Sequence, residues 1–360
     1  MTPTQALHDI GQSLWLDNIT RDLLKSGTLE HYIDALGITG LTSNPTIFDH
    51  AFQKSAAYDD GIREKLKAGQ TGENLFFSLA LEDITAAADL FRPIHDRTAG
   101  VDGWVSLEVS PLLAHDTKST LAEAKELHGR AGRPNLFIKI PGTLEGLPAI
   151  EEAIFAGIPV NVTLLFSRSH YVAAAEAYLR GIERRIAAGL SPVVGSVASL
   201  FISRWDVAVA KTVAPELQDK LGIAIGKQVY NAYCELIQSP RWMRIFNYGA
   251  RPQRLLFAST GTKDPTASDV LYIEHLAAPL TVNTMPEKTL KEYADHGTMA
   301  PLVTHGGGDA EAVLGRFAAN GVDLDALAAK LQNDGAASFV KSWNELMEGL
   351  AAKSGTLKAA

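Results

Sequence analysis

A lysine inside a short apolar segment is the residue of this chain whose position most directly suggests chemistry. Lys139 stands between Ile138 and Ile140. Lysine is rarely fully buried, and taking an amine out of water disfavours its charged form, which frees the lone pair near neutral pH. A neutral amine attacks carbonyl compounds and forms a Schiff base. The alternative is an ordinary lysine on a sheet-edge strand that reaches solvent, and the residues alone leave both open.

Oxygen-bearing side chains occur in other apolar segments of the chain. Asp17 and Glu108 lie near the ends of two such segments, and Thr163 lies inside a third. Making an imine and cleaving the carbon–carbon bond beside it both require proton transfer, which carboxylates can perform. We expect Asp17 and Glu108 to be general acid/base groups and Thr163 to relay a proton through water. Three further side chains can hold sugar hydroxyls, namely Asn44, Asn161 and Ser199.

Two places in the second half of the chain can bind a phosphate group. Arg204 follows one apolar segment, and Ser259 to Lys263 (STGTK) follows the next. Glycine with hydroxyls and a lysine suits an anion-binding turn, and barrel enzymes often bind phosphate near their last loops. The plain alternatives are a surface ion pair for Arg204 and an ordinary turn for the second segment.

Motifs for other kinds of catalysis are missing from the sequence. The histidines form no His-x-His or His-Glu-x-x-His pair, and no Gly-x-Gly-x-x-Gly element follows a strand-like segment. No Gly-x-Ser-x-Gly elbow occurs. The glycines at 306–308 lack the lysine of a nucleotide loop, and we interpret them as a plain loop. We therefore expect no cofactor and no metal.

Eight short apolar segments alternate with segments of helical character, which is typical of an α/β protein. Segments this uniformly apolar suit parallel strands covered by helices. Eight such units favour a single (β/α)8 TIM barrel, with the whole chain, 1–360, as one domain. Residues 45–103 and 203–254 are long enough for two or three helices each. The candidate strands are 14–19, 38–43, 104–109, 136–140, 159–166, 193–202, 255–259 and 280–284.

Alternation along these strands places the polar residues on one face. Residues two apart share a face, so Asp17 accompanies Trp15, and Lys139 accompanies Phe137. The opposite, purely apolar face can pack on helices, which turns the polar face toward the barrel axis. Polar groups from six strands that converge at the carboxyl end are costly unless they pair or react. Active sites of such barrels lie at that end.

Helices are expected over 117–128, 143–156 and 167–188, the last with Ser167 as N-cap and Gly189 beyond its end. Near the C-terminus, Phe339, Trp343, Leu346 and Leu350 form one apolar stripe at helical spacing. We expect a C-terminal helix docked on the barrel, although the stripe can also face a partner subunit. Monomer and homodimer both stay open. Residues 354–360 are expected to fray.

Charge and composition exclude several classes of protein. The 360 residues carry a formal net charge of −8 without a dense Lys/Arg tract, which argues against a nucleic-acid partner. The sequence contains no run of about 18 apolar residues, so no membrane span is predicted. The start of the sequence does not resemble a signal peptide. One cysteine, Cys234, allows no internal disulfide, so a cytoplasmic location is expected.

The chain resembles the transaldolase family, in its longer bacterial form. The matching segments are SLWLDNI (13–19), GLTSNPTIF (40–48), FIKIPGT (137–143), GIPVNVTLLF (157–166), SVASLFISRWD (196–206) and TVNTMP (281–286). This resemblance implies cofactor-free transfer of a dihydroxyacetone unit in the non-oxidative pentose phosphate pathway. The unit would pass from sedoheptulose 7-phosphate to glyceraldehyde 3-phosphate, giving erythrose 4-phosphate and fructose 6-phosphate.

The resemblance also implies a role for each matching residue. Lys139 would form the Schiff base, Asp17 would be the acid/base for bond cleavage, and Glu108 and Thr163 would hold the catalytic water. Asn44, Asn161 and Ser199 would bind donor hydroxyls, and Arg204 would bind phosphate. The chain departs from the family after the seventh strand, where many members have Ser-Phe-Arg. Here Lys263 would replace the arginine, as a point charge without its two-pronged geometry.

Three alternatives accompany this interpretation. A lyase on the same scaffold would release free dihydroxyacetone; similar lyases are shorter and carry tyrosine where this chain has Phe201. A non-catalytic sugar-phosphate-binding protein would leave a buried amine beside two carboxylates unexplained. The third alternative is a longer parent chain, because some transaldolase-like domains are fused to a sugar-phosphate isomerase.

Overall fold

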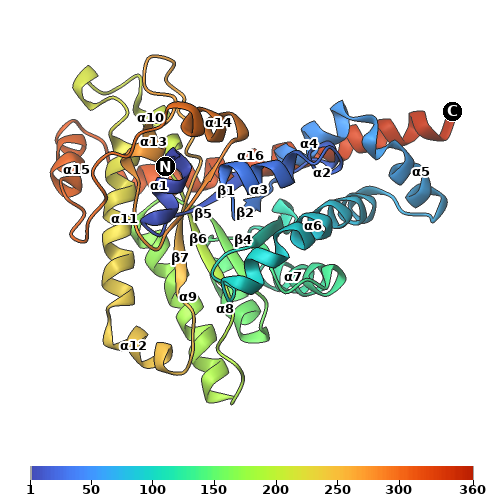
Figure 1. Cartoon of the computed structure of the whole chain (residues 1–360), viewed down its shortest axis with the longest axis horizontal. Helices are drawn as coiled ribbons and strands as arrows, with labels where there is room; N and C mark the ends of the chain where they lie inside the picture. The colour runs from blue at the N-terminus through green and yellow to red at the C-terminus, as the bar shows by residue number, and fades with distance from the viewer. Residues whose placement is uncertain (1, 360) are drawn as a thin grey trace.

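A closed barrel of eight parallel strands forms the centre of the protein (Figure 1). The computed structural model describes residues 2–359, and it confirms the predicted (β/α)8 architecture. Almost every strand residue is buried, because helices cover the outside and side chains fill the inside. The strands are β1 Ser13–Asp17, β2 Gly40–Thr42, β3 Trp104–Glu108, β4 Leu136–Pro141, β5 Val160–Leu165, β6 Ser196–Phe201, β7 Gln253–Ala258 and β8 Val282–Met285.

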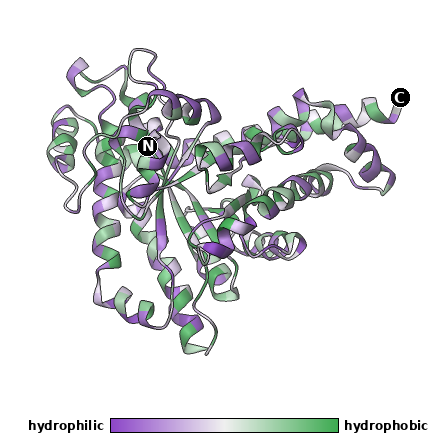
Figure 2. Cartoon of the chain, viewed as in Figure 1, coloured by the Kyte–Doolittle hydropathy of each residue, from purple (hydrophilic) through white to green (hydrophobic). Residues whose placement is uncertain are grey.

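Helices connect the strands and surround the barrel. Figure 2 shows hydrophobic residues along the strands and a mixture of hydrophobic and hydrophilic residues along the helices. The two long connections hold three α-helices each, as expected. The first part of the chain has α1 Pro3–Asp9, α2 Arg21–Lys25, α3 Thr28–Leu36, α4 Pro45–Lys54, α5 Asp59–Lys67, α6 Gly72–Arg97, α7 Thr117–Ala131 and α8 Gly146–Ala156. The second part has α9 Arg168–Ala187, α10 Ser203–Val209, α11 Leu221–Ile237, α12 Pro240–Asn247, α13 Leu271–His275, α14 Glu287–His296, α15 Ala310–Ala319 and α16 Leu324–Ala359. Short 3-10 turns lie at Ala56–Tyr58, Pro111–Leu113 and Pro215–Leu217.

Several strands begin one to three residues away from the predicted position, and the differences at β6 and β7 have a physical reason. β6 begins at Ser196 and not at residue 193, and its neighbour Gly195 lies so close to Trp104 that a Cβ would come within 2.7 Å of the indole. β7 begins earlier than predicted, at Gln253. Its first two residues are polar, which is why the sequence did not indicate a strand there, but both are paired inside the barrel. Gln253 donates to the Ser196 hydroxyl at 2.9 Å, and Arg254 donates to the Ser13 hydroxyl at 2.7 Å.

The amino-terminal half of the barrel interior is filled by paired charges and stacked rings. Asp102 accepts hydrogen bonds from Ser13 (2.5 Å) and Trp15 (3.1 Å), and its carboxylate lies 3.7 Å from the Arg254 guanidinium. At the same end of the barrel, the rings of Trp104 and Phe137 stack with centroids 4.0 Å apart. The polar side chains named here at this end of the barrel therefore pair with one another, around a cavity that is described below.

The predicted C-terminal helix is present as α16 with its apolar stripe buried, but it ends later than predicted. Phe339, Trp343, Leu346 and Leu350 are all buried, and the Trp343 ring meets Phe76 of α6 edge-on at 4.9 Å. The expectation that residues 354–360 fray is wrong for the part of the segment that is described, since the helix continues to Ala359; Ala360 lies outside the described residues. Lys353 anchors this end by donating to the carbonyls of Phe52 (2.9 Å) and Ser55 (2.6 Å).

Within residues 2–359, none of the helices combines the length and the apolar composition needed to cross a lipid bilayer.

Candidate active site

A cavity of about 250 Å³ opens at the carboxyl ends of the barrel strands. Most of the side chains singled out in the sequence meet there, although they come from strands far apart in the chain. Those that line the cavity are Asp17, Asn44, Lys139, Thr163, Ser199, Phe201, Arg204, Ser259 and Lys263. Glu108 and Asn161 do not line it, but both are buried beside Lys139 on the neighbouring strands β3 and β5.

Lys139 points into the barrel and is only 6% exposed. Its ammonium nitrogen donates to the backbone carbonyl of Ser43 at 2.9 Å and lies 3.3 Å from a carboxylate oxygen of Glu108. The closed barrel has no sheet edge, so the alternative of an edge-strand lysine that reaches solvent is wrong. A buried amine with one acceptor and one carboxylate in reach is held at a fixed place at the cavity floor.

Two carboxyl groups act on this amine, the buried Glu108 and the half-buried Asp17, and both have a raised pKa. Burial raises the pKa of Asp17, and the Lys139 charge and the 2.7 Å hydrogen bond from Thr42 oppose that rise. Burial also raises the pKa of Glu108, again opposed by Lys139, while the charge of Asp17 raises the pKa further. Carboxyl groups with raised pKa values can exchange protons with a reacting group near neutral pH.

Some polar atoms next to Lys139 are buried without a hydrogen-bond partner among the described residues. They are the hydroxyl oxygen of Thr163 and both carboxylate oxygens of Glu108, one of which has only its ion pair with Lys139 at 3.3 Å. Leaving such atoms unpaired is costly, so their presence in a folded protein calls for a functional explanation. β3 and β5 lie on either side of β4, which places this carboxylate and this hydroxyl on opposite sides of the lysine strand.

The amide and hydroxyl groups predicted to bind sugar hydroxyls lie at two depths. Asn44 caps α4 by accepting from the Ile47 amide at 3.1 Å, and its side chain also lines the cavity. Ser199 lines the cavity too and donates to Asn161 at 2.7 Å, while Asn161 donates to Ser106 at 3.2 Å. Asn161 therefore lies in the layer below, where it holds Ser199, and its direct contact with substrate stays a prediction.

Two cations face the cavity from its outer rim. Arg204 is the second residue of α10, and its guanidinium lies over the Phe201 ring at 5.2 Å; Lys263 follows β7. Neither side chain has a carboxylate within 4.0 Å in the part of the chain that the structure describes, so the surface ion pair considered for Arg204 is not formed. Between them, Ser259 has a left-handed backbone (φ +56°), a strained conformation that is enriched at functional sites.

Sequence reasoning missed several residues of this cavity. Thr42 bonds to both Asp17 and Thr284, and its place at the carboxyl end of the second strand, where active-site residues of barrels lie, was an available signal. Phe339 lines the cavity from α16, although its stripe had been interpreted as docking surface alone. His50 of α4 also lines the cavity, and no pattern in the sequence singles it out.

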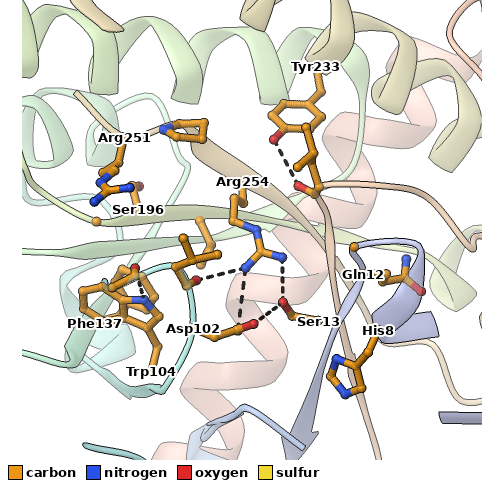
Figure 3. Close-up of a pocket in the computed structure, with 17 residues that line it drawn as sticks. His8, Gln12, Ser13, Asp102, Trp104, Phe137, Ser196, Tyr233, Arg251 and Arg254 are labelled. Carbon is orange, nitrogen blue, oxygen red and sulfur yellow. Dashed lines mark hydrogen bonds and ion pairs between the residues drawn. The ribbon is translucent and has the colours of Figure 1, made fainter. Parts of the chain in front are cut away.

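A second cavity, of about 310 Å³, lies at the opposite, amino-terminal end of the barrel (Figure 3). Its polar lining includes the Arg254, Asp102 and Ser13 side chains, which bond to one another, and its apolar wall includes Trp104 and Phe137. Arg254 and Asp102 pair with each other there, and no lysine lines this cavity. The chemistry of the molecule therefore belongs to the carboxyl-end cavity, in agreement with the general behaviour of such barrels.

Metal binding is not indicated by the arrangement of side chains. Among residues 2–359, no three His, Cys, Asp or Glu side chains come together in a group that could hold a metal ion.

Comparison with known proteins places this geometry in a family. A family model described as Transaldolase/Fructose-6-phosphate aldolase matches residues 14–350. The chain is 45% identical to a transaldolase of Thermobifida fusca over 359 residues, which cover 97% of this chain and 98% of that protein. It is 44% identical to a transaldolase of an Arthrobacter species, with 96% of each chain covered. It is 43% identical to a transaldolase of Thiobacillus denitrificans, covering 96% of this chain and 99% of the relative.

Proposed function

The chain belongs to the transaldolase/fructose-6-phosphate aldolase family and functions as a transaldolase, and from that premise we propose that it works through a Schiff base on Lys139. The observation that carries the proposal is the buried Lys139 amine at the cavity floor, with the Glu108 carboxylate 3.3 Å away and Asp17 close enough to act on it electrostatically. Substrates of the family are sugar phosphates.

The proposed reaction begins when the Lys139 nitrogen attacks the ketone carbon of the donor sugar phosphate. A carbinolamine forms and loses water, which leaves a protonated imine. Glu108 and Thr163 are proposed to hold that water between them, because their unpaired oxygens lie on either side of β4. Moving protons at this step needs a group that can take up and return one, which the raised pKa of Glu108 favours.

Asp17 is proposed to act in the next step, the cleavage of the carbon–carbon bond. The carboxylate removes the proton of the hydroxyl on the carbon β to the imine carbon, the bond breaks, and its electron pair flows into the imine. An aldehyde phosphate leaves, and a neutral enamine of dihydroxyacetone stays on Lys139. The acceptor aldehyde enters, the enamine attacks it, and the proton on Asp17 passes to the new alkoxide. Hydrolysis of the imine then releases the product ketose phosphate and the free amine.

We propose transfer between sedoheptulose 7-phosphate and glyceraldehyde 3-phosphate, giving erythrose 4-phosphate and fructose 6-phosphate, in preference to lyase activity. Phe201 at the cavity wall supports transfer, because it offers no hydroxyl to protonate the bound enamine. With fructose 6-phosphate as donor, release of glyceraldehyde 3-phosphate should depend on erythrose 4-phosphate and fall at least about tenfold without it. A coupled assay with and without the acceptor measures this. Equal rates with free dihydroxyacetone as product would establish the lyase instead.

Arg204 and Lys263 are proposed to hold the phosphate group of the substrates. Replacing Arg204 with methionine should raise KM for fructose 6-phosphate about ten- to a hundredfold, the usual loss for a charge-assisted hydrogen bond, with kcat within a few-fold. Lys263→Met should have a smaller effect of the same kind, since a lysine provides a point charge only. The control is Arg168→Met, an exposed arginine at the start of α9 that pairs with Glu235. An unchanged KM in Arg204→Met would contradict the assignment.

We infer a cytoplasmic location, which a single free cysteine, Cys234, fits. Whether the chain acts as a monomer or a homodimer stays a prediction for a solution measurement of mass.

A further inference from the structure

Strand β5 has a backbone kink directly after the proposed catalytic residue Thr163. Leu164, the next residue, has φ +58°, a left-handed conformation that a leucine rarely adopts. The pairing of β5 with β6 shifts at the same place, from Val162 opposite Ala198 to Leu165 opposite Leu200. A strained residue of this kind persists only where the surrounding structure holds it.

The carbonyl of Leu164 bonds to a side chain from the other end of the sequence. Gln332 of α16 donates its side-chain amide to Leu164 O at 3.0 Å and to Gly142 O, just after β4, also at 3.0 Å. The amide of Gly142 in turn donates to Thr163 O at 2.7 Å. One glutamine side chain therefore joins the ends of the two strands that carry Lys139 and Thr163.

Helix α16 is shaped to approach this kink closely. Gly335 lies one turn after Gln332, and a Cβ there would come within 2.9 Å of the Leu164 side chain and 3.1 Å of the Arg204 guanidinium. Glycine is disfavoured inside a helix, so its presence here fits a need for close approach. The same helix contributes Phe339 to the cavity wall.

We propose that Gln332 is a positioning residue, which holds the kinked end of β5 so that the Thr163 hydroxyl stands beside Lys139 and Glu108. Gln332 does not line the cavity, so it acts through the two carbonyls and not on substrate. The inference rests on the proposed function, since it assigns Thr163 a part in the imine steps. Without the two donated hydrogen bonds, the buried carbonyls lose their partner and the kink can relax.

The test replaces Gln332 with methionine, which has similar length and no donor. We expect kcat for fructose 6-phosphate with erythrose 4-phosphate to fall about ten- to a hundredfold, as is common when a reacting group is misplaced by about 1 Å. KM should stay within about threefold, because Arg204 and Lys263 are untouched. The matched control is Asn333→Met on the exposed next position of the same helix, with kcat expected to be unchanged. If Gln332→Met does not fold, Gln332→Glu takes its place in the test. Glutamate has the same shape as glutamine and, when ionised, has no hydrogen-bond donor.

A double-mutant cycle with Thr163→Val separates positioning from mere anchoring of the helix. If Gln332 acts through Thr163, Gln332→Met should lower kcat less than about twofold in the Thr163→Val background. Full loss in both backgrounds, or an unchanged kcat in the single variant that lacks the donor, would overturn the proposal. Borohydride trapping of fructose 6-phosphate on Lys139 is run on the wild type in parallel. Absence of that adduct would contradict the proposed function. If the adduct is present but the effects of the two substitutions on kcat simply add, only the Gln332 assignment fails.

Discussion

Lys139→Met is expected to lower kcat/KM for transfer by about 10⁴-fold or more, the scale of loss seen when a catalytic nucleophile is removed. Methionine keeps most of the side-chain volume and removes the amine, so no imine can form. The measurement is a coupled assay that follows release of glyceraldehyde 3-phosphate from fructose 6-phosphate in the presence of erythrose 4-phosphate.

The control for this variant is Lys353→Met, which removes another lysine that donates to backbone carbonyls. Lys353 lies on α16, where it bonds to Phe52 and Ser55, and it does not line the cavity. Its variant should unfold more easily but keep its kcat when folded. Circular dichroism must show that Lys139→Met is folded; a folded Lys139→Met protein with activity within tenfold of the wild type would contradict the proposed role.

Asp17→Asn is expected to lower kcat about 10²- to 10⁴-fold while imine formation on Lys139 continues. Asparagine has the shape of aspartate and can still accept the Thr42 hydrogen bond, but it cannot take the proton from the hydroxyl of the donor sugar. The imine should therefore accumulate with fructose 6-phosphate, so that borohydride traps more of it than in the wild type. Both quantities, kcat and the trapped fraction, are measured on the same preparation.

Asp49→Asn serves as the matched control for Asp17→Asn. Asp49 is also buried, and burial raises its pKa too, but it lies on α4 and does not line the cavity. We expect it to keep a kcat near that of the wild type. If Asp17→Asn kept kcat within a few-fold, or lost imine formation together with turnover, Asp17 would not be the group that cleaves the bond.

The eight strands and the faces of their residues were predictable because burial on both sides leaves a plain mark in a sequence. Mainly apolar segments such as 136–140 stand out, and the two-residue alternation places Glu108 and Lys139 on the inner face without any three-dimensional information. The convergence of most of the predicted side chains on one cavity was predictable for the same reason. A lysine among isoleucines violates the pattern around it, and such violations concentrate at functional sites.

The features that were not predicted depend on partners distant in the sequence. Gln253 and Arg254 begin β7 although they are polar, because Ser196 of the neighbouring strand and Ser13 of β1 accept hydrogen bonds from them. The kink at Leu164 has no local signal, since the side chain that pairs its carbonyl lies on α16. The end of α16 was expected to fray from its composition, but tertiary contacts of Lys353 hold it. In each case tertiary pairing overrides local propensity.

The most direct test of the account is borohydride reduction of the wild-type protein in the presence of fructose 6-phosphate, followed by intact mass and peptide mapping. Reduction converts an imine into a stable amine on the lysine that formed it. We predict one adduct of the size of dihydroxyacetone, on the peptide that contains Lys139, and none in Lys139→Met. An adduct on another lysine, or no adduct on a folded protein, would contradict the assignment of Lys139 as the nucleophile.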